Sequence, residues 1–269
     1  MTTSDDGTGI VRTEQNGGVL RIVLDRPARR NALTPTMVET VIAALTAAAT
    51  DDRLRAIHLA GHGAHFCAGI DWVAGTDDGA KPRTGHLLRR VPHGAHRLVE
   101  LVHTTHLPVV CTVRGWAAGL GCNLALAADF TLATPTATFW EPFLDRGFSP
   151  DSGATWLLPR LIGLARARRM LLLGERVGGD TAVDWGLIHE CAADDDLDAA
   201  VDALLDRLTI APTVAFGLAK QTLAQNLHAT LPQALTSELQ ALELACRTSD
   251  FREGSAAFRE HRRPDFQGR

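Results

Sequence analysis

The chain contains no tyrosine, no long apolar run and no excess of basic residues. The missing tyrosine by itself implies nothing about function. No stretch of 18 residues is continuously apolar, so the sequence predicts no membrane-spanning helix. The 27 lysines and arginines are outnumbered by 31 aspartates and glutamates, which gives a formal net charge of −4. Without a basic run, the composition argues against a nucleic-acid partner.

Disulfide and zinc motifs are also missing. No CxxC occurs, and five cysteines are scattered along the chain: Cys67, Cys111, Cys122, Cys191 and Cys246. An odd number of thiols, most of them within apolar runs, favours reduced core cysteines in a cytoplasmic protein. The polar, acidic start MTTSDDGTG does not resemble a signal peptide, which agrees with a cytoplasmic location.

Nucleotide-binding signatures are absent as well. The chain has no GxxxxGKS or GxxxxGKT, and Gly115, Gly119 and Gly121 lack the GxGxxG spacing. What remains is an ordinary globular composition, with 45% hydrophobic and 22% charged residues among 269. That length is enough for one large domain or two small ones.

The most informative stretch runs from Pro108 to Asp129. An apolar, β-branched run over 109–113 predicts a buried strand, and the small apolar residues of 122–128 predict a buried helix. The glycine-rich turn between them leaves unpaired N–H groups at the positive end of a helix, which suits a phosphate or a developing oxyanion. The alternative is a tightly packed contact between helix and strand, for which such turns are also common.

A second stretch over 56–72 repeats this pattern, because a strand again leads into a turn of small residues at 65–71. An oxyanion hole needs two N–H groups that converge on one point. Two strand-to-turn units can supply them, so the pair of stretches favours the oxyanion interpretation over simple packing.

Elsewhere the pattern predicts an α/β core followed by helices. Residues 1–9 are expected to form a disordered tail, and 10–24 a hairpin that turns at Asn16-Gly17-Gly18. A helix is expected from Thr34-Pro35 to about Thr50. Strands and helices alternate through residues 10–194, with helices expected at about 165–173 and 180–185 and a last strand over 187–191. Residues 195–269 are expected to be helical throughout.

Two further segments allow two interpretations each. Residues 75–92 lack periodicity and follow the first turn, so they form either a lid over a substrate or an ordinary surface connection. His93, His96, Glu100 and His103 share one face of a predicted helix over 93–106. That face is either a metal site or, as is more common, a solvated surface opposite apolar residues.

Four motifs together resemble the crotonase (enoyl-CoA hydratase/isomerase) superfamily. They are FCAGID, VRGWAAGLGCNLALAADF, LDRPARRNALTPTM and the tail DFREGSAAFREHRRPDFQGR, and they extend over essentially the whole chain. The resemblance implies a spiral ββα core over 10–194 and a C-terminal helical region that mediates assembly into trimers or dimers of trimers. It also implies an acyl-CoA substrate, with coenzyme A as part of that substrate, no separate cofactor and no metal.

The resemblance further assigns the two oxyanion donors to the backbone N–H groups of Ala68 and Leu120. Cys67 stands next to Ala68, where it is either a nucleophile or a small buried filler. Residues expected to contact coenzyme A are Arg29, Arg30, Ala68, Ile70 and Asp71, with Phe258 of the tail reaching a neighbouring subunit. For Arg29 and Arg30, solvated surface is the alternative.

Proton transfer departs from the family pattern. Hydratases of this family use two glutamates, and their positions correspond here to Asn123 and Phe143. An asparagine amide cannot act as a base near neutral pH, although it can form hydrogen bonds with a water or a substrate. A phenylalanine side chain can do neither. Asp151 falls where some family members, including isomerases and aryl-CoA dehalogenases, place a working aspartate. It is either catalytic or the cap of a following helix. Glu141, two residues before Phe143, is a substitute acid if the segment is extended.

The sequence therefore predicts an acyl-CoA enzyme that stabilises a thioester enolate and isomerises a double bond with one aspartate. Three alternatives remain: a hydratase with non-standard acids, a dehalogenase, and a catalytically weak acyl-CoA-binding protein. The aromatic residues Trp72, Trp116, Trp140 and Phe143 either line the acyl site or belong to the core.

Overall fold

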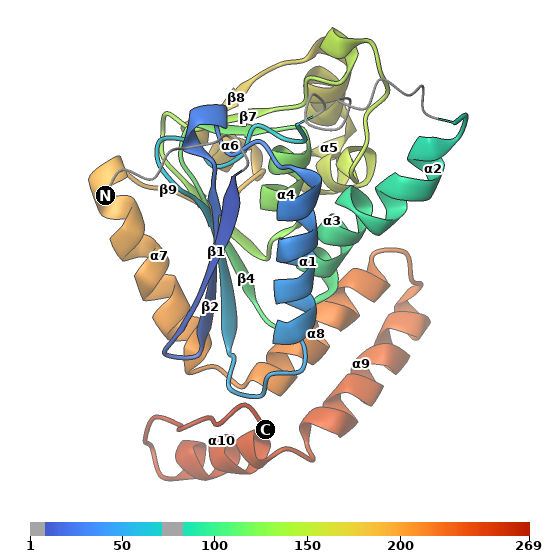
Figure 1. Ribbon diagram of the computed structural model, residues 1–269. Coiled ribbons are helices and arrows are strands. Elements are labelled where there is room, and N and C mark those ends of the chain that lie inside the picture. Colours follow the sequence, from blue (N-terminus) through green and yellow to red (C-terminus); the bar gives the residue numbers. More distant parts are fainter. Residues whose placement is uncertain (1–8, 72–82) are drawn as a thin grey trace.

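The structure is a computed structural model that describes residues 9–71 and 83–269. Its centre is a six-stranded sheet of order β1-β2-β3-β4-β6-β9, beside which β5, β7 and β8 form a smaller sheet (Figure 1). Only β1 runs antiparallel to its neighbour in the large sheet. This mixed α/β architecture confirms the predicted fold class.

The bounds of the elements are as follows. The strands are β1 (Ile10–Asn16), β2 (Val19–Asp25), β3 (Ala56–Gly61), β4 (Val109–Val113), β5 (Trp116–Ala118), β6 (Phe130–Ala133), β7 (Thr138–Trp140), β8 (Val177–Gly178) and β9 (Glu190–Cys191). The α-helices are α1 (Pro35–Ala48), α2 (His86–Arg90), α3 (Ala95–Thr104), α4 (Leu120–Ala127), α5 (Ala154–Leu173), α6 (Gly179–Trp185), α7 (Asp194–Thr209), α8 (Thr213–Asn226), α9 (Leu231–Ala245) and α10 (Ser249–Arg259). Short 3₁₀ helices are η1 (Pro27–Arg29), η2 (Val91–His93) and η3 (Leu144–Arg146).

Helices cover both faces of the large sheet, with α7 on one side and α1, α3 and α4 on the other (Figure 1). The alternation of side chains along β4 matches this arrangement, because Val109, Cys111 and Val113 join the core beneath α1 and α3. Val110 points the other way, toward the leucines of α7. A strand buried on both faces reads as a continuous apolar run, which is why the sequence revealed it.

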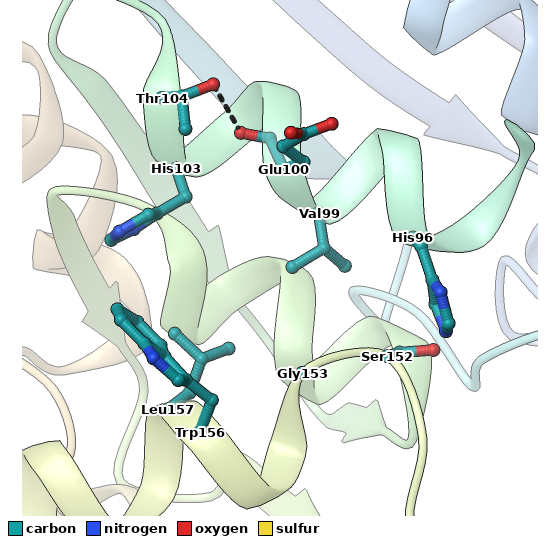
Figure 2. A pocket seen from close by; sticks show the side chains of 9 residues that line it. All are labelled: His96, Val99, Glu100, His103, Thr104, Ser152, Gly153, Trp156 and Leu157. Carbon is teal, nitrogen blue, oxygen red and sulfur yellow. Dashed lines mark hydrogen bonds between the residues drawn. The ribbon is translucent and has the colours of Figure 1, made fainter. Parts of the chain in front are cut away.

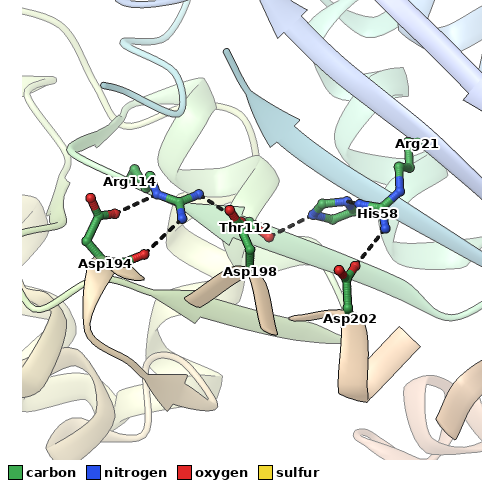
Figure 3. Close-up of polar contacts among 7 residues, drawn as sticks. All are labelled: Arg21, His58, Thr112, Arg114, Asp194, Asp198 and Asp202. Carbon is green, nitrogen blue, oxygen red and sulfur yellow. Dashed lines mark hydrogen bonds and ion pairs between the residues drawn. The ribbon is translucent and has the colours of Figure 1, made fainter. Parts of the chain in front are cut away.

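Polar contacts between α7 and the sheet accompany this apolar packing (Figure 3). Arg114, just after β4, contacts Asp194 at 2.7 Å and Asp198 at 3.1 Å, and Arg21 of β2 contacts Asp202 at 2.7 Å. Since α7 begins at Asp194 and packs on the sheet, the helical region predicted from residue 195 starts with a helix that belongs to the core layers.

The predicted elements around the first turns are confirmed. The hairpin β1–β2 turns through Gly17 and Gly18, both with positive φ, as a two-residue loop requires. Helix α1 begins with Pro35, and its N-cap Thr34 accepts a hydrogen bond from the N–H of Met37.

Two predicted boundaries were wrong. A helix was expected from about residue 165, whereas α5 already begins at Ala154, with Pro159 inside it and Gly163 as a non-helical interruption. The proline and glycine concealed the first half of the helix in the sequence. The strand expected over 187–191 pairs with the sheet only at Glu190 and Cys191.

The last three helices lie beside and below the sheet, with α10 at the end of the molecule opposite β7 and β8 (Figure 1). Lys220 of α8 attaches them to the core, because its ammonium lies 2.6 Å from the Asp129 carboxylate and also donates to the carbonyl of Leu107. In the parts of the chain that the structure describes, no helix is both long and apolar enough to cross a membrane.

Candidate active site

The two glycine-containing turns lie against each other, as the sequence predicted. Cys67 and Ala117 form a parallel bridge, in which the N–H of Cys67 donates to the Trp116 carbonyl and the N–H of Ala118 donates to the Cys67 carbonyl, both at 2.9 Å. Backbone hydrogen bonds therefore fix the distance between the turns without help from side chains.

Two glycines make this approach possible. Gly69 has φ +93°, and a Cβ added there would lie 2.8 Å from the Ala118 carbonyl oxygen and 3.6 Å from the Leu120 nitrogen. A Cβ on Gly121 would lie 2.4 Å from the Cys67 carbonyl oxygen. Any side chain at either position would force the turns apart.

The free N–H groups of the site differ from the predicted pair. The N–H of Ala68 donates to the Arg30 carbonyl at 2.9 Å, so it is already used inside the chain and the assignment of Ala68 as a donor was wrong. Among the described residues, the N–H groups of Ile70 and Leu120 have no hydrogen-bond partner. Leu120 is the first residue of α4, where such a group is expected. Ile70 and Leu120 both line one small pocket.

Side chains behind the first turn hold it in place. Asp71 pairs with Arg26 at 2.6 Å, and both side chains are largely buried. Asn31 donates to the carbonyls of His62 and His65 and accepts from the N–H of Arg26. Asp71 was predicted to contact coenzyme A, but its ion pair shows it stabilising the turn that presents Ile70.

The pocket between the turns is completed by the segment that leads into α5. Its lining includes Pro142, Phe143, Arg146, Phe148, Asp151 and Ser152 in addition to the residues of both turns. Asp151 is the one carboxylate among these lining residues. The predicted catalytic aspartate and the two free N–H groups therefore share one pocket, although Asp151 lies 81 positions beyond Ile70 in the sequence.

The Asp151 carboxylate is held by a residue from α3. Nε2 of His96 lies 2.6 Å from Oδ1 of Asp151. Among the described residues, the second oxygen, Oδ2, accepts only a long hydrogen bond of 3.4 Å from the Ser152 hydroxyl. Ser152 itself has φ +57°, which is uncommon for a residue with a side chain. His96 was predicted only as part of a helical stripe, and a separation of 55 residues gives no local signal for its pairing with Asp151.

Asn123 lies behind the pocket and is not among the residues that line it. It is fully buried on α4, and its Nδ2 donates to the carbonyls of Gly119 at 3.2 Å and Asp151 at 3.4 Å. The amide thus connects the second turn to the backbone of Asp151. Phe143, at the other position where the family pattern has a glutamate, lines the pocket with its ring edge-on to Phe148 at 5.5 Å.

Glu141 does not lie in this pocket, so its prediction as a substitute acid was wrong. Strand alternation ends at Trp140, and Phe143 has helical φ and ψ, so Glu141 and Phe143 do not share a face. Glu141 is fully buried beside the Cys122 thiol, and neither of its oxygens has a hydrogen-bond partner among the described residues. Burial raises its pKa well above the ordinary value, which favours the protonated form of the carboxyl group.

Three of the five cysteines lie in the core, as most of them were predicted to. Cys67, Cys111 and Cys122 are buried and none forms a disulfide. Burial raises the pKa of Cys67 to about 12, so it is a thiol at neutral pH and fills space beneath the first turn.

The remaining residues that were predicted to contact coenzyme A or to cover the substrate lie in different parts of the molecule. Arg29 and Arg30 are exposed, and the Arg30 carbonyl contacts the first turn, so both arginines lie near the pocket on the surface. Phe258 is 84% exposed on α10, far from the turns of its own chain (Figure 1). Residues 75–82 of the predicted lid and Trp72 lie outside the described residues.

Trp116 and Trp140 do not line the pocket. Their ring centres are 5.7 Å apart, and the Arg176 guanidinium lies over both rings, at 5.3 Å and 4.5 Å. They form a separate cluster around the small sheet.

The histidine stripe of α3 is also divided among different contacts. His96 contacts Asp151, whereas His103 packs edge-on against Trp156 at 5.2 Å. Within residues 9–71 and 83–269, no group of three or more His, Cys, Asp or Glu side chains has the arrangement of a metal site.

Comparison with known proteins agrees with this geometry. The family model described as enoyl-CoA hydratase/isomerase matches residues 14–269. A "Probable enoyl-CoA hydratase" of Rhodobacter capsulatus is 39% identical over 96% of this chain and 98% of its own length. The 1,2-epoxyphenylacetyl-CoA isomerase of Escherichia coli is 36% identical over 94% of this chain and 96% of its own.

Solved structures show the same fold. The crystal structure of an enoyl-CoA hydratase from Polaromonas sp. JS666 superposes with a TM-score of 0.85 at 30% identity, covering 96% of this chain and 100% of that one. The chain therefore belongs to the enoyl-CoA hydratase/isomerase family of the crotonase superfamily, and it is an enzyme of that family.

Proposed function

We propose that this enzyme isomerises the double bond of an enoyl-CoA, with Asp151 as the only proton-transferring carboxylate. The observation that carries this proposal is the composition of the pocket. It combines two free backbone N–H groups, on Ile70 and Leu120, with one carboxylate. The family's usual hydratases use two glutamates, and in this chain Asn123 and Phe143 occupy the positions expected for them.

The thioester oxygen of the substrate would accept hydrogen bonds from the N–H groups of Ile70 and Leu120. When a proton leaves the carbon next to the carbonyl, its electron pair delocalises onto this oxygen. Donors already aimed at the oxygen stabilise that charge, and one such donor is typically worth about 2.7–4 kcal/mol.

Asp151 would then move a single proton. Its carboxylate removes the proton from the carbon next to the carbonyl of a 3-enoyl thioester. The resulting carboxylic acid, on a side chain that is 36% exposed, exchanges its proton with solvent and returns a proton two carbons further along the acyl group. The double bond thereby shifts into conjugation, and the thioester has the same number of atoms before and after. Because Nε2 of His96 holds Oδ1, Oδ2 is the oxygen left to face the substrate.

The test is incubation of the purified enzyme with a 3-enoyl-CoA and, separately, with crotonyl-CoA in D₂O, followed by mass spectrometry. We expect a 2-enoyl-CoA that has gained deuterium without gaining water. Asp151→Asn should lower the rate by about 10²–10⁴-fold, because a general base contributes about that factor. Asp145→Asn, which changes an exposed carboxylate outside the pocket, serves as the matched control and should leave the rate unchanged.

Two other results would overturn the proposal. Rapid formation of a 3-hydroxyacyl-CoA would identify a hydratase that uses other acids. No reaction with either thioester, together with tight binding of both, would identify an acyl-CoA-binding protein without this catalysis.

A further inference from the structure

The pocket of the two N–H groups contains an arginine whose charge the proposed function does not use. Arg146 lines this pocket together with Asp151, and it is the one lysine or arginine among the described lining residues. Within the described parts of the chain, its guanidinium has no hydrogen bond, ion pair or ring contact. Arg26, behind the first turn, is by contrast paired with Asp71. A positive charge is therefore left at the pocket wall.

The 3₁₀ helix η3 places Arg146 beside Phe143. The N–H of Arg146 donates to the Phe143 carbonyl at 3.1 Å, and Gly147, with φ +77°, ends the helix. Side chains three residues apart eclipse each other in a 3₁₀ helix. Arg146 and Phe143 therefore lie on one side of η3, and both line the pocket.

The phenylalanine at position 143 leaves this charge without a partner. The family's usual hydratases carry a glutamate there, and a glutamate on the same side of η3 would lie within reach of the Arg146 guanidinium. Phe143 instead packs edge-on against Phe148 at 5.5 Å, and both rings line the pocket with Arg146. Apolar rings next to a charged group keep water away on that side, which strengthens its attraction for an anion.

The pocket is small enough to bring an anion bound to Arg146 close to the thioester. Its volume is about 30 Å³, close to the share of one molecule in liquid water. Ile70 and Leu120 border this space together with Arg146, so few atoms can separate the anion from the thioester carbonyl. The phosphates of coenzyme A are separated from its sulfur by the long pantetheine arm. The anion that suits this position therefore belongs to the acyl group.

A neighbouring cavity offers no comparable partner for an anion. It lies between α3 and the start of α5 and shares Ser152 with the pocket (Figure 2). The described residues that line it include no lysine or arginine, and Glu100 among them is an acid. Burial lowers the pKa of His103, which favours the neutral ring there. A carboxylate near the thioester is therefore attracted toward Arg146 and not into this cavity.

We propose that Arg146 binds a carboxylate at the end of a short acyl group, so that the enzyme selects thioesters of short dicarboxylic acids. The inference deepens the proposed function, because it rests on the pocket of Ile70 and Leu120 as the place of the thioester. A guanidinium and a carboxylate form two parallel hydrogen bonds, which an uncharged acyl group cannot match. Arg146 then determines specificity, while Asp151 moves the proton.

Calorimetric binding of glutaryl-CoA and pentanoyl-CoA tests the inference, since both acyl groups have five carbons and only the first ends in a carboxylate. The native enzyme should bind glutaryl-CoA about five- to tenfold more tightly, because the ion pair is hydrogen-bonded but Arg146 is exposed to solvent. Arg146→Gln should bind the two thioesters with equal affinity. Arg146→Glu should prefer pentanoyl-CoA, because it brings two negative charges together.

Arg168→Gln is the matched control. Arg168 is also an exposed arginine, but it lies on α5 and does not line the pocket, so this variant should keep the native ratio of affinities. An unchanged ratio in both Arg146→Gln and Arg146→Glu would overturn the inference.

Binding of free coenzyme A distinguishes the acyl carboxylate from a phosphate as the partner of Arg146. If Arg146→Gln weakened the binding of coenzyme A and of both thioesters by the same factor, the guanidinium would bind a phosphate and the inference would be wrong. Because saturated thioesters are not isomerised, these outcomes are independent of whether Asp151 catalyses isomerisation.

Discussion

Gly69 is the residue on which the spacing of the two N–H groups depends most directly. Gly69→Ala would place a methyl group 2.8 Å from the Ala118 carbonyl and beside the Leu120 nitrogen. The turn must then shift, so the donors no longer converge on one oxygen. We expect kcat/KM of isomerisation to fall by about 10²–10³-fold, the usual effect of losing one such donor.

A substitution at a second glycine, Gly17, serves as a control for the backbone strain that alanine causes at a positive φ. Gly17 also has positive φ, but a Cβ added there meets nothing within 4 Å. Gly17→Ala should therefore lower the free energy of unfolding by about 1 kcal/mol and leave kcat/KM unchanged. Retained activity in Gly69→Ala would show that the two turns do not form the oxyanion hole.

At the scale of single residues, the sequence identified which segments and residues lie at the pocket, but it did not identify which backbone N–H groups are free. The two turns, Leu120 and Asp151 could be found from their motifs. The choice between Ala68 and Ile70 could not, because it depends on a carbonyl from Arg30, 38 residues earlier, which occupies the Ala68 N–H. The contact between His96 and Asp151 was equally hidden, since it joins helix α3 to the loop before α5, and these segments meet only in the folded chain.

Elements with a clear start signal were predicted well and those with internal breakers were not. Thr34-Pro35 marked α1 and the glycine pair marked the β1–β2 hairpin. Pro159 and Gly163 obscured α5, although packing of its buried residues keeps both halves in one element. Tertiary contacts outweighed local preference there, and that information is not local to the sequence.

The free energy of unfolding should depend on pH through His58 of β3, a histidine that is buried where α7 packs on the sheet. Its Nδ1 lies 3.1 Å from an Arg21 nitrogen and its Nε2 lies 2.7 Å from the Thr112 hydroxyl (Figure 3). Burial, followed by the charge of Arg21, lowers the His58 pKa to about 4, while Asp198 and Asp202 of α7 act in the opposite direction. In the unfolded chain the pKa is about 6.5.

Between pH 6.5 and pH 4 the unfolded chain therefore binds a proton at this position and the folded chain does not. The free energy of unfolding should fall by up to about 3 kcal/mol as the pH is lowered through this window. Urea unfolding at pH 7, 5.5 and 4.5 measures it, and His58→Gln should have a smaller slope than the native enzyme. His93→Gln, at an exposed position, should keep the native slope; identical slopes for all three proteins would contradict the assignment.

The whole molecule leaves a large apolar surface on its last three helices. Exposed residues there include Leu223, Leu227, Leu231, Leu235, Leu239, Leu242, Phe251 and Phe258. Monomeric proteins rarely expose so much apolar surface in one region. We propose that these helices pack against neighbouring copies in a closed trimer or a dimer of trimers, which would also allow Phe258 to reach another subunit.

Sedimentation velocity tests this proposal. The native enzyme should sediment as a trimer or hexamer. The double variant Leu235→Asp/Leu239→Asp, on one face of α9, should sediment as smaller species because two charges would be buried in the interface. Ile10→Asp, which changes an exposed residue of β1, should not alter assembly. A monomeric native enzyme would refute the proposal.

The bridge between Cys67 and Ala117 has a consequence for how such an enzyme can change during evolution. It fixes the N–H groups of Ile70 and Leu120, the proposed oxyanion donors, through main-chain atoms alone, so substitutions around the pocket do not need to preserve those groups. Asp151 sits on a separate segment, where exchange of one side chain adds or removes a proton-transferring group. New reactions of activated thioesters are then reachable by a few substitutions near the start of α5, without rebuilding the part that stabilises their shared intermediate.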